Sequence, residues 1–243
     1  MSQFDPVTFE SPAEKRIYRH VERHGPRPAE AVSESLSLPA AEFDEGLDRL
    51  RQAGHVEDRD GMLALAVDLG DSESFETQDF TYTIRPATED DYEGLLALVR
   101  EIAEKKTYVV AEELAAEMAY DETVLRHSNT ASRTFFVATV DDEIVGWSHL
   151  ELPLLEKLRA TAEVTVGVDP DYRGYSIGTE LLDRSLALAE ANDCLKVYKN
   201  VARTNMQAVS FLEARGWEQE GVRTDHYVIG HKPVDQVMLA YTF

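Results

Sequence analysis

The chain of 243 residues contains a single cysteine, only seven lysines and no long apolar run. One cysteine, Cys194, excludes an internal disulfide and is typical of a protein from a reducing cytosol. No apolar run approaches the roughly 18 residues that a membrane span needs, and the first residues lack the charged and apolar pattern of a secretory signal. We therefore expect a cytoplasmic protein with no membrane partner.

Basic residues are also scarce, because 24 Lys and Arg face 46 Asp and Glu, which gives a formal charge of −22. The acidic residues are spread over the whole chain, and 17 of the basic residues are Arg. An acidic surface with little Lys is typical of a halophilic protein, since the salt of its cytoplasm screens the repulsion between like charges. The alternative interpretation is an acidic surface that binds a partner.

The first 70 residues are expected to form a small helical domain. Apolar residues recur every three to four positions in three segments, at about 12–24, 28–35 and 37–54. Two short apolar segments then flank an Asp-Gly turn at 60–61, which predicts a hairpin. Three helices and a hairpin resemble a winged helix-turn-helix domain, which we assign to 1–70. The acidic and polar residues 71–78 are expected to form a linker.

Residues 79–243 predict a second domain of mixed α/β class. The expected elements are a strand at 80–85, helices at about 88–102 and 111–127, a hairpin over 134–152, a strand at 161–168, a helix at 177–191, a strand at 195–200, a helix at 205–215 and a final hairpin around 230–231. An antiparallel meander followed by strand–helix–strand–helix predicts a mostly antiparallel sheet flanked by helices.

The most informative segment runs from Val164 to Thr179, with the sequence VTVGVDPDYRGYSIGT. It reads as a strand, a tight glycine-bearing turn and the start of a helix. Glycine lets backbone N–H groups approach a ligand closely, and a helix N-terminus offers unsatisfied donors that suit a pyrophosphate. A Walker loop is excluded because the Gly-Lys-Ser/Thr ending is absent. The alternative is an ordinary strand-to-helix turn.

Three motifs resemble those of the GNAT superfamily of N-acyltransferases, and they occur in the family's order. They are Val168-Asp169-Pro170 with Arg173-Gly174-x-x-Ile177-Gly178, then Asn205-x-x-Ala208-x-x-Phe211 with Gly216-Trp217, and finally Glu220-Gly221-x-Arg223 with Val234-Asp235-x-Val237-Met238. The similarity covers about 79–243. It implies a GNAT-like fold and an N-acetyltransferase that transfers an acetyl group from acetyl-CoA to a primary amine of a small molecule or peptide.

The resemblance also implies which residues bind acetyl-CoA. The pyrophosphate would lie on the loop formed by Arg173, Gly174, Tyr175, Ser176, Ile177, Gly178 and Thr179. The pantetheine arm would pair with the end of the preceding strand, at Val166, Gly167 and Val168, and Asn205 would contact the cofactor. Ser176 replaces the central glycine of the family pattern and fits this loop if its φ is negative. Lys196, Lys199 and Arg203 are candidates for additional positive charge.

Acyl transfer to an amine needs a group that takes a proton from the amine. Residues of a strand alternate between its two faces, and Ala162 and Val164 suit the helix-packed face. Glu163 therefore projects to the opposite face, and it is our candidate general base. His149 and Glu151 on the preceding strand are the alternatives. We expect no metal site.

The general acid is not evident from the sequence. Leu212 lies where many members of the family carry a tyrosine, and leucine cannot donate a proton. Tyr227 and Tyr198 are the candidates for this role, unless the cofactor thiolate leaves without an acid.

Two other functions compete with the enzyme: a DNA-binding regulator that senses an acyl-CoA, and a protein-interaction module. Residues 1–70 carry 14 acidic and 8 basic residues, whereas contact with phosphate needs Lys or Arg. The basic stripe of the first helix consists of Lys15, Arg16, Arg19 and Arg23, so DNA as a partner is weakly supported. The apolar connection 152–155 indicates either core packing or a homodimer contact.

Overall fold

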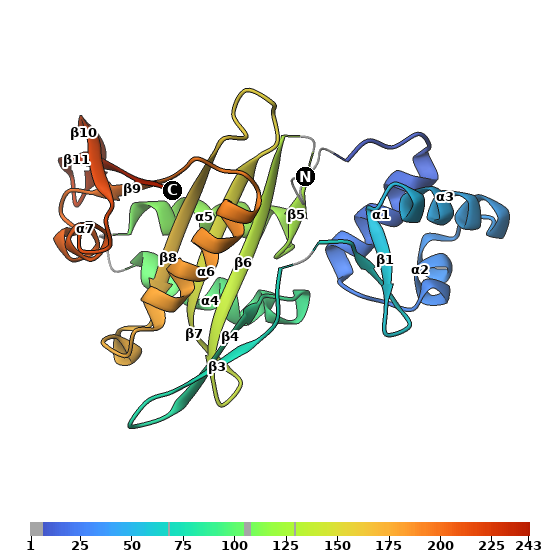
Figure 1. The fold of residues 1–243 in the computed structure, drawn as a ribbon, viewed down its shortest axis with the longest axis horizontal. Coiled ribbons are helices and arrows are strands. Elements are labelled where there is room, and N and C mark those ends of the chain that lie inside the picture. Colours follow the sequence, from blue (N-terminus) through green and yellow to red (C-terminus); the bar gives the residue numbers. More distant parts are fainter. Residues whose placement is uncertain (1–6, 68, 105–107, 129) are drawn as a thin grey trace.

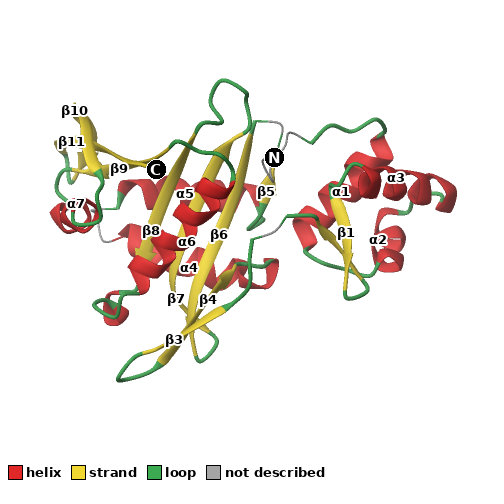
Figure 2. Cartoon of the chain, viewed as in Figure 1, coloured by secondary structure: helices red, strands yellow, loops and turns green. Residues whose placement is uncertain are grey.

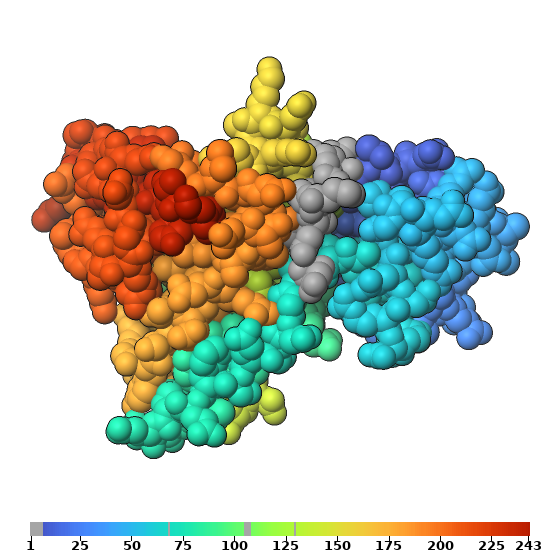
Figure 3. Space-filling view, in the orientation of Figure 1, coloured from blue at the N-terminus to red at the C-terminus, as the bar shows by residue number. Residues whose placement is uncertain are grey.

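The computed structural model describes residues 7–67, 69–104, 108–128 and 130–243. A small helical lobe lies at one end of the molecule, and a larger unit built on a nine-stranded sheet forms the rest (Figure 1). The space-filling view shows the same division, with the N-terminal residues in blue at one end and the C-terminal residues in red at the other (Figure 3). Among the described residues, no helix is long and apolar enough to cross a membrane.

The N-terminal lobe contains three helices and a two-stranded antiparallel sheet. Its elements are α1 (Pro12–His24), α2 (Ala29–Leu36), α3 (Ala40–Gln52), β1 (Val56–Arg59) and β2 (Met62–Leu65). Ser11 caps α1 by accepting a hydrogen bond from the Glu14 N–H at 3.2 Å. Asp60 and Gly61 both have positive φ, as a tight hairpin turn requires. The elements appear in the expected order, and the assignment to the winged helix class stays a prediction.

The large sheet has the strand order β10-β11-β9-β8-β7-β6-β4-β3, and β5 pairs with β6 outside this path. Its strands are β3 (Glu73–Glu76), β4 (Thr81–Pro86), β5 (Arg126–His127), β6 (Ala131–Val140), β7 (Glu143–Pro153), β8 (Thr161–Val168), β9 (Lys196–Ala202), β10 (Glu218–Ile229) and β11 (Lys232–Thr242). All pairs between these strands are antiparallel except β8 with β9. The expected mixed and mostly antiparallel sheet is therefore confirmed.

Helices cover both faces of this sheet (Figure 2). They are α4 (Tyr92–Glu104), α5 (Val109–Asp121), α6 (Ile177–Ala191) and α7 (Met206–Glu213), with short 3-10 helices at Glu89–Asp91 and Pro170–Tyr172. One apolar core joins α6 and α7 to one face, through residues such as Leu181 and Val164. A second core joins α4 and α5 to the other face, through Phe135 and Trp147. The layered α/β architecture follows from these two cores.

Strands β8 and β9 are paired over only part of their length. Their ladder joins residues 161–163 to 196–198, whereas β8 continues to Val168 and β9 to Ala202. The two strands therefore diverge beyond Glu163, and Figure 1 shows β9 running away from β8 toward β10 and β11. Among the described residues, the edge of β8 from 164 to 168 has no strand partner on this side.

Two expectations about the organisation of the chain are corrected by the structure. Residues 71–78 do not form a free linker, because 73–76 are strand β3, which pairs with β4 at the edge of the sheet. Phe75 anchors this strand by stacking on Tyr82 at 5.0 Å. The second helix of this unit ends at Asp121 rather than near 127, since Glu122 adopts a left-handed conformation and Arg126–His127 pair with β6.

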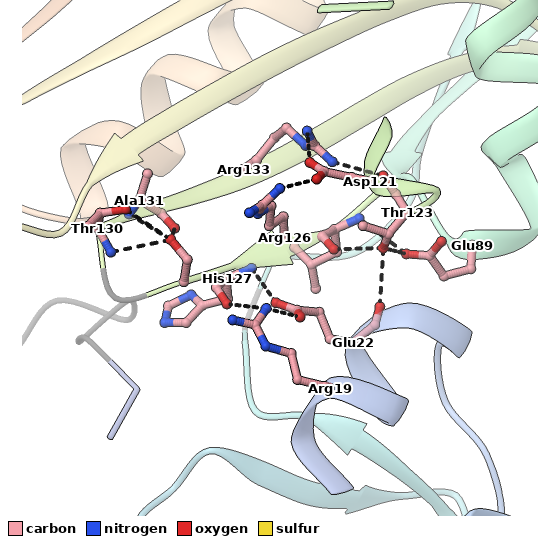
Figure 4. A network of polar contacts seen from close by, with 12 residues as sticks. Arg19, Glu22, Glu89, Asp121, Thr123, Arg126, His127, Thr130, Ala131 and Arg133 are labelled. Carbon is pink, nitrogen blue, oxygen red and sulfur yellow. Dashed lines mark hydrogen bonds and ion pairs between the residues drawn. The ribbon is translucent and has the colours of Figure 1, made fainter. Parts of the chain in front are cut away.

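A polar network joins the N-terminal lobe to the sheet (Figure 4). Glu22 on α1 is 5% exposed, and its carboxylate accepts hydrogen bonds from the His127 N–H of β5 and from Arg19. Arg19 also donates to the His127 carbonyl at 3.3 Å. Thr123 donates to Glu89 at 2.8 Å, and Arg133 donates to the Thr123 carbonyl at 2.9 Å. Arg19, which belongs to the basic stripe of the first helix, is thus held by contacts within the chain.

Candidate active site

The loop between β8 and α6 presents backbone donors that the rest of the chain does not use. Asp169 begins it by accepting a hydrogen bond from the Asp171 N–H at 2.9 Å, and Gly174 has a φ of 90°. Within the described part of the chain, the N–H groups of residues 174–178 make no hydrogen bond. The N–H of Thr179 differs, because it donates to the Ser176 carbonyl at 2.8 Å. The start of α6 therefore offers a cluster of unsatisfied donors to an anion.

Ser176 does not have the negative φ that we expected. It lies in the left-handed region, with φ 67° and ψ 0°, at the N-cap of α6. Its side chain makes no capping hydrogen bond, so the hydroxyl does not explain this conformation. Turn geometry at the start of α6 imposes the positive φ, which glycine would adopt without strain.

A cavity of about 330 Å³ opens beside this loop. It is lined by β8, the loop, the first turns of α6 and one face of α7. Nine of the predicted cofactor residues line it: Val166, Gly167, Val168, Arg173, Gly174, Ser176, Ile177, Gly178 and Thr179. The structure therefore brings most of the predicted residues to one concave surface.

Two predicted cofactor residues do not line this cavity. The Tyr175 ring packs against Phe80 with centroids 4.7 Å apart, and its hydroxyl donates to Asp79 at 2.6 Å. The Asn205 side chain caps α7 by accepting a hydrogen bond from the Ala208 N–H at 3.2 Å. Asn205 also lines a smaller neighbouring cavity of about 50 Å³. Of these two, Tyr175 can contribute only its backbone to the loop, and Asn205 has a structural role in holding α7.

The basic side chains at the cavity differ in part from those expected. Of the three additional basic residues that we expected, Lys199 lines the cavity, whereas Lys196 and Arg203 do not. Lys196 forms an ion pair with Glu220, and Arg203 forms one with Asp235. Arg215, which the sequence analysis missed, lines the cavity beside the loop. Its guanidinium lies 3.9 Å from the centre of the Phe211 ring and donates to the Thr179 hydroxyl.

The position of Arg215 could have been found from the sequence. It follows Phe211 by four residues within the expected helix 205–215, and residues four apart on a helix lie on one face. In the structure, α7 ends at Glu213, two residues before Arg215. Arg173, which was predicted, donates to the Val168 carbonyl at 3.1 Å and faces the Tyr108 ring at 5.9 Å. Two cations thus flank the unsatisfied N–H groups.

The candidate base Glu163 lies on the sheet face opposite α6 and is exposed. Its register partners are Glu151 on β7 and Tyr198 on β9. Burial raises the pKa of Glu151, and the charges of Glu117 and Glu163 raise it further. Acidic side chains from α5, β7 and β8 therefore gather on this face of the sheet.

The other candidate acids and bases are less suited to proton transfer. Burial lowers the pKa of His149 to about 3, so its imidazole is a weak base. Burial raises the pKa of Tyr227, whose hydroxyl accepts a hydrogen bond from Gln236 at 2.5 Å. Leu212 lines the cavity and supplies no acid there. Cys194 is buried with a pKa raised by burial to about 11, which excludes a reactive thiolate at neutral pH.

Comparison with known proteins decides the family. The model of the Acetyltransferase (GNAT) family matches residues 95–217, which include the loop and the whole of α7. The chain belongs to this family. It is therefore an acyltransferase, and its N-acetyltransferase activity is of the GNAT type.

Two curated relatives agree with this assignment. An N-alpha-acetyltransferase of Sulfurisphaera tokodaii is 30% identical over 115 residues, which are 44% of this chain and 69% of the relative. An uncharacterized N-acetyltransferase of Methanocaldococcus jannaschii is 29% identical over 147 residues, which are 58% of this chain and 63% of the relative.

Solved structures support the fold. The structure of an acetyltransferase of the GNAT family from Streptococcus pneumoniae superposes on this chain with a TM-score of 0.54 at 18% sequence identity. The superposition covers 67% of this chain and 99% of the Streptococcus chain. At this identity the similarity concerns the fold alone. The GNAT-like mixed sheet flanked by helices is confirmed, and the winged helix assignment of the N-terminal lobe rests on the sequence pattern.

Proposed function

We propose that this acetyltransferase transfers the acetyl group of acetyl-CoA to a primary amine. The observation that carries the proposal is the set of unpaired N–H groups at 174–178, which open onto the cavity of about 330 Å³. Such donors at a helix start suit a pyrophosphate, and Arg173 and Arg215 add positive charge beside them. These cations offset locally the field of a chain that carries a net charge of −22.

The divergence of β8 from β9 supports a second part of the cofactor site. Beyond Glu163 the backbone groups of β8 have no partner on β9, so this edge can pair with an amide-bearing arm of a ligand. Val166, Ile177 and Phe211 give the adjoining cavity apolar walls. Enzymes of this family typically use acetyl-CoA, whose pyrophosphate and amide-bearing arm match these two surfaces.

Acetyl-CoA, when bound, supplies a thioester that an amine can attack. The chain's own residues then bind, orient and move protons. The amides at 174–178 hold the phosphates, the free edge of β8 orients the arm, and Glu163 accepts a proton from the amine on the opposite face. Leu212 lines the cavity and can offer no proton to a leaving thiolate.

The amine acceptor is expected to carry positive charge before it reacts. The charges of Glu117 and Glu163 raise the pKa of Glu151, so negative charge gathers on the face that the acceptor would approach. An α-amine has a pKa of about 7.7–8.0, so it is attracted as the ammonium ion and deprotonated without a large cost. The named activity of the Sulfurisphaera relative favours the α-amine of a protein or peptide.

The test is an acceptor screen at high KCl that follows release of free CoA thiol and the mass of the product. We expect acetylation of peptide α-amines by the wild type. Gly178→Val is the control, because Gly178 lines the cavity at the second residue of α6 and a branched side chain there would obstruct the phosphates. Thiol release that is absent for every amine, or equal in Gly178→Val, would contradict the proposal.

A further inference from the structure

Lys199 takes an unusual path through the sheet. On β9 its backbone position shares a face with Val197 and Val201, which are buried in the core beneath α6 and α7. Its Nζ nevertheless donates to the Thr165 hydroxyl at 2.7 Å, and Thr165 alternates with Val164 and Val166 on β8. Because neighbouring residues of a strand point to opposite faces, the Lys199 side chain crosses the gap between the diverging strands.

This gap is also where the two cavities meet. Lys199, Val166, Tyr108 and Ala208 line both the cavity beside the phosphate loop and the smaller cavity near α5. A ligand that extends from the loop along β8 therefore ends next to the Lys199 amine. The amine reaches the gap on the side of Thr165 and His149, which are register partners on the face that carries Glu163.

The surroundings of Lys199 favour a neutral amine. Burial lowers the pKa of Lys199 to about 7, although the charge of Glu163 on β8 acts in the opposite direction. His149 on β7 also faces this site, and its low pKa keeps it uncharged at neutral pH. Lys196, three residues earlier on β9, is ion-paired with Glu220, and its pKa is raised by that contact.

We propose that Lys199 is an acetyl acceptor within the enzyme itself, so that the chain acetylates its own Lys199. The inference rests on the proposed use of acetyl-CoA. The neutral Nζ attacks the thioester carbonyl carbon, a C–N bond forms and the C–S bond breaks. CoA leaves as the thiolate and takes the proton that the amine releases. The products are N-acetyl-Lys199 and free CoA thiol.

The difference in pKa sets the expected selectivity. Each pKa unit changes the ratio of neutral to charged amine tenfold, so near neutral pH Lys199 has on the order of 10³-fold more neutral amine than a lysine of ordinary pKa. Chemical acetylation by free acetyl-CoA would not need the cofactor cavity, so it would persist in Gly178→Val, whereas transfer from bound acetyl-CoA to Lys199 would be lost in that variant.

The experiment incubates the full chain with acetyl-CoA at high KCl without an amine acceptor, and maps acetyl-lysine by peptide mass spectrometry. We expect one acetyl group on Lys199 in the wild type and in the matched control Lys196→Arg, and none in Lys199→Arg. Site mapping in the wild type decides the question even if Lys199→Arg folds poorly. An unmodified Lys199, or equal modification of Lys196 and Lys199, would overturn the inference.

Calorimetric titration of acetyl-CoA and the peptide acceptor assay, run on the same preparation, separate the two proposals. If acetyl-CoA binds and peptide amines are acetylated while Lys199 stays unmodified, only the inference about Lys199 fails. If acetyl-CoA does not bind, the proposed function fails and this inference fails with it.

Discussion

Replacing Ser176 by glycine should stabilise the protein, because Ser176 is held in a left-handed conformation at the start of α6. For a residue with a Cβ this conformation costs roughly 1–2 kcal/mol. Glycine removes that cost but makes the unfolded chain more flexible, which offsets about 0.4–1 kcal/mol. The net expectation for Ser176→Gly is an increase of about 0.5–1 kcal/mol in the free energy of unfolding.

Two control substitutions isolate the cause. Ser176→Ala keeps the Cβ and removes only a hydroxyl that makes no capping hydrogen bond, so we expect little change. Ser210→Gly places the same substitution at an exposed position inside α7, where the backbone is helical. Glycine is a poorer helix former than serine, so this control should lose about 0.5 kcal/mol.

Scanning calorimetry at fixed KCl measures the effect. For a protein of this size, 1 kcal/mol corresponds to a shift of about 2–4 °C, so Ser176→Gly should raise the midpoint by about 1–4 °C. Acetyl-CoA affinity should be unchanged or higher, since the backbone of the loop keeps its conformation. A midpoint that falls in Ser176→Gly as it does in Ser210→Gly would refute the argument that backbone strain is stored at this loop.

Glu163→Gln should lower turnover by roughly 10²-fold or more with little change in acetyl-CoA affinity, whereas equal rates at every pH would leave Glu163 without a role as base. Burial raises the pKa of Glu22 above its ordinary value of 4.5, so the folded state binds the proton of Glu22 more tightly than the unfolded state does. The free energy of unfolding therefore falls as the pH rises from about 4.5 toward the raised pKa. Glu22→Gln should remove this part of the pH dependence in urea unfolding, and an unchanged pH profile would argue against it. Stability and acetyl-CoA affinity should both increase as KCl rises from about 0.1 M toward about 3 M, because screening weakens the repulsion within a chain of charge −22 and between the chain and an anionic cofactor. Maxima of both quantities in dilute buffer would contradict the interpretation of a halophilic surface.

Elements with local signals could be predicted from the sequence. The Asp-Gly turn at 60–61 marks its hairpin, and helix α1 begins after the capping Ser11. The glycine-bearing turn between β8 and α6 was likewise evident from a few neighbouring residues. These features depend on backbone preferences of single residues, which a sequence displays directly.

Features that depend on distant contacts could not be predicted. Strand β3 has a charged, polar sequence that is typical of a linker as well as of an edge strand, and its pairing with β4 decides between them. The positive φ of Ser176 follows from the geometry at the start of α6 rather than from its side chain. The course of Lys199 depends on the divergence of β8 and β9, which no local pattern on either strand indicates.

A crystal structure of the acetyl-CoA complex at high KCl tests the central claim most directly. We predict that the pyrophosphate oxygens lie within about 3 Å of N–H groups from residues 174–178, with Arg215 beside them and the arm along the free edge of β8. The thioester should end in the gap next to Lys199. A cofactor bound elsewhere, or no cofactor at saturating concentration, would contradict the account.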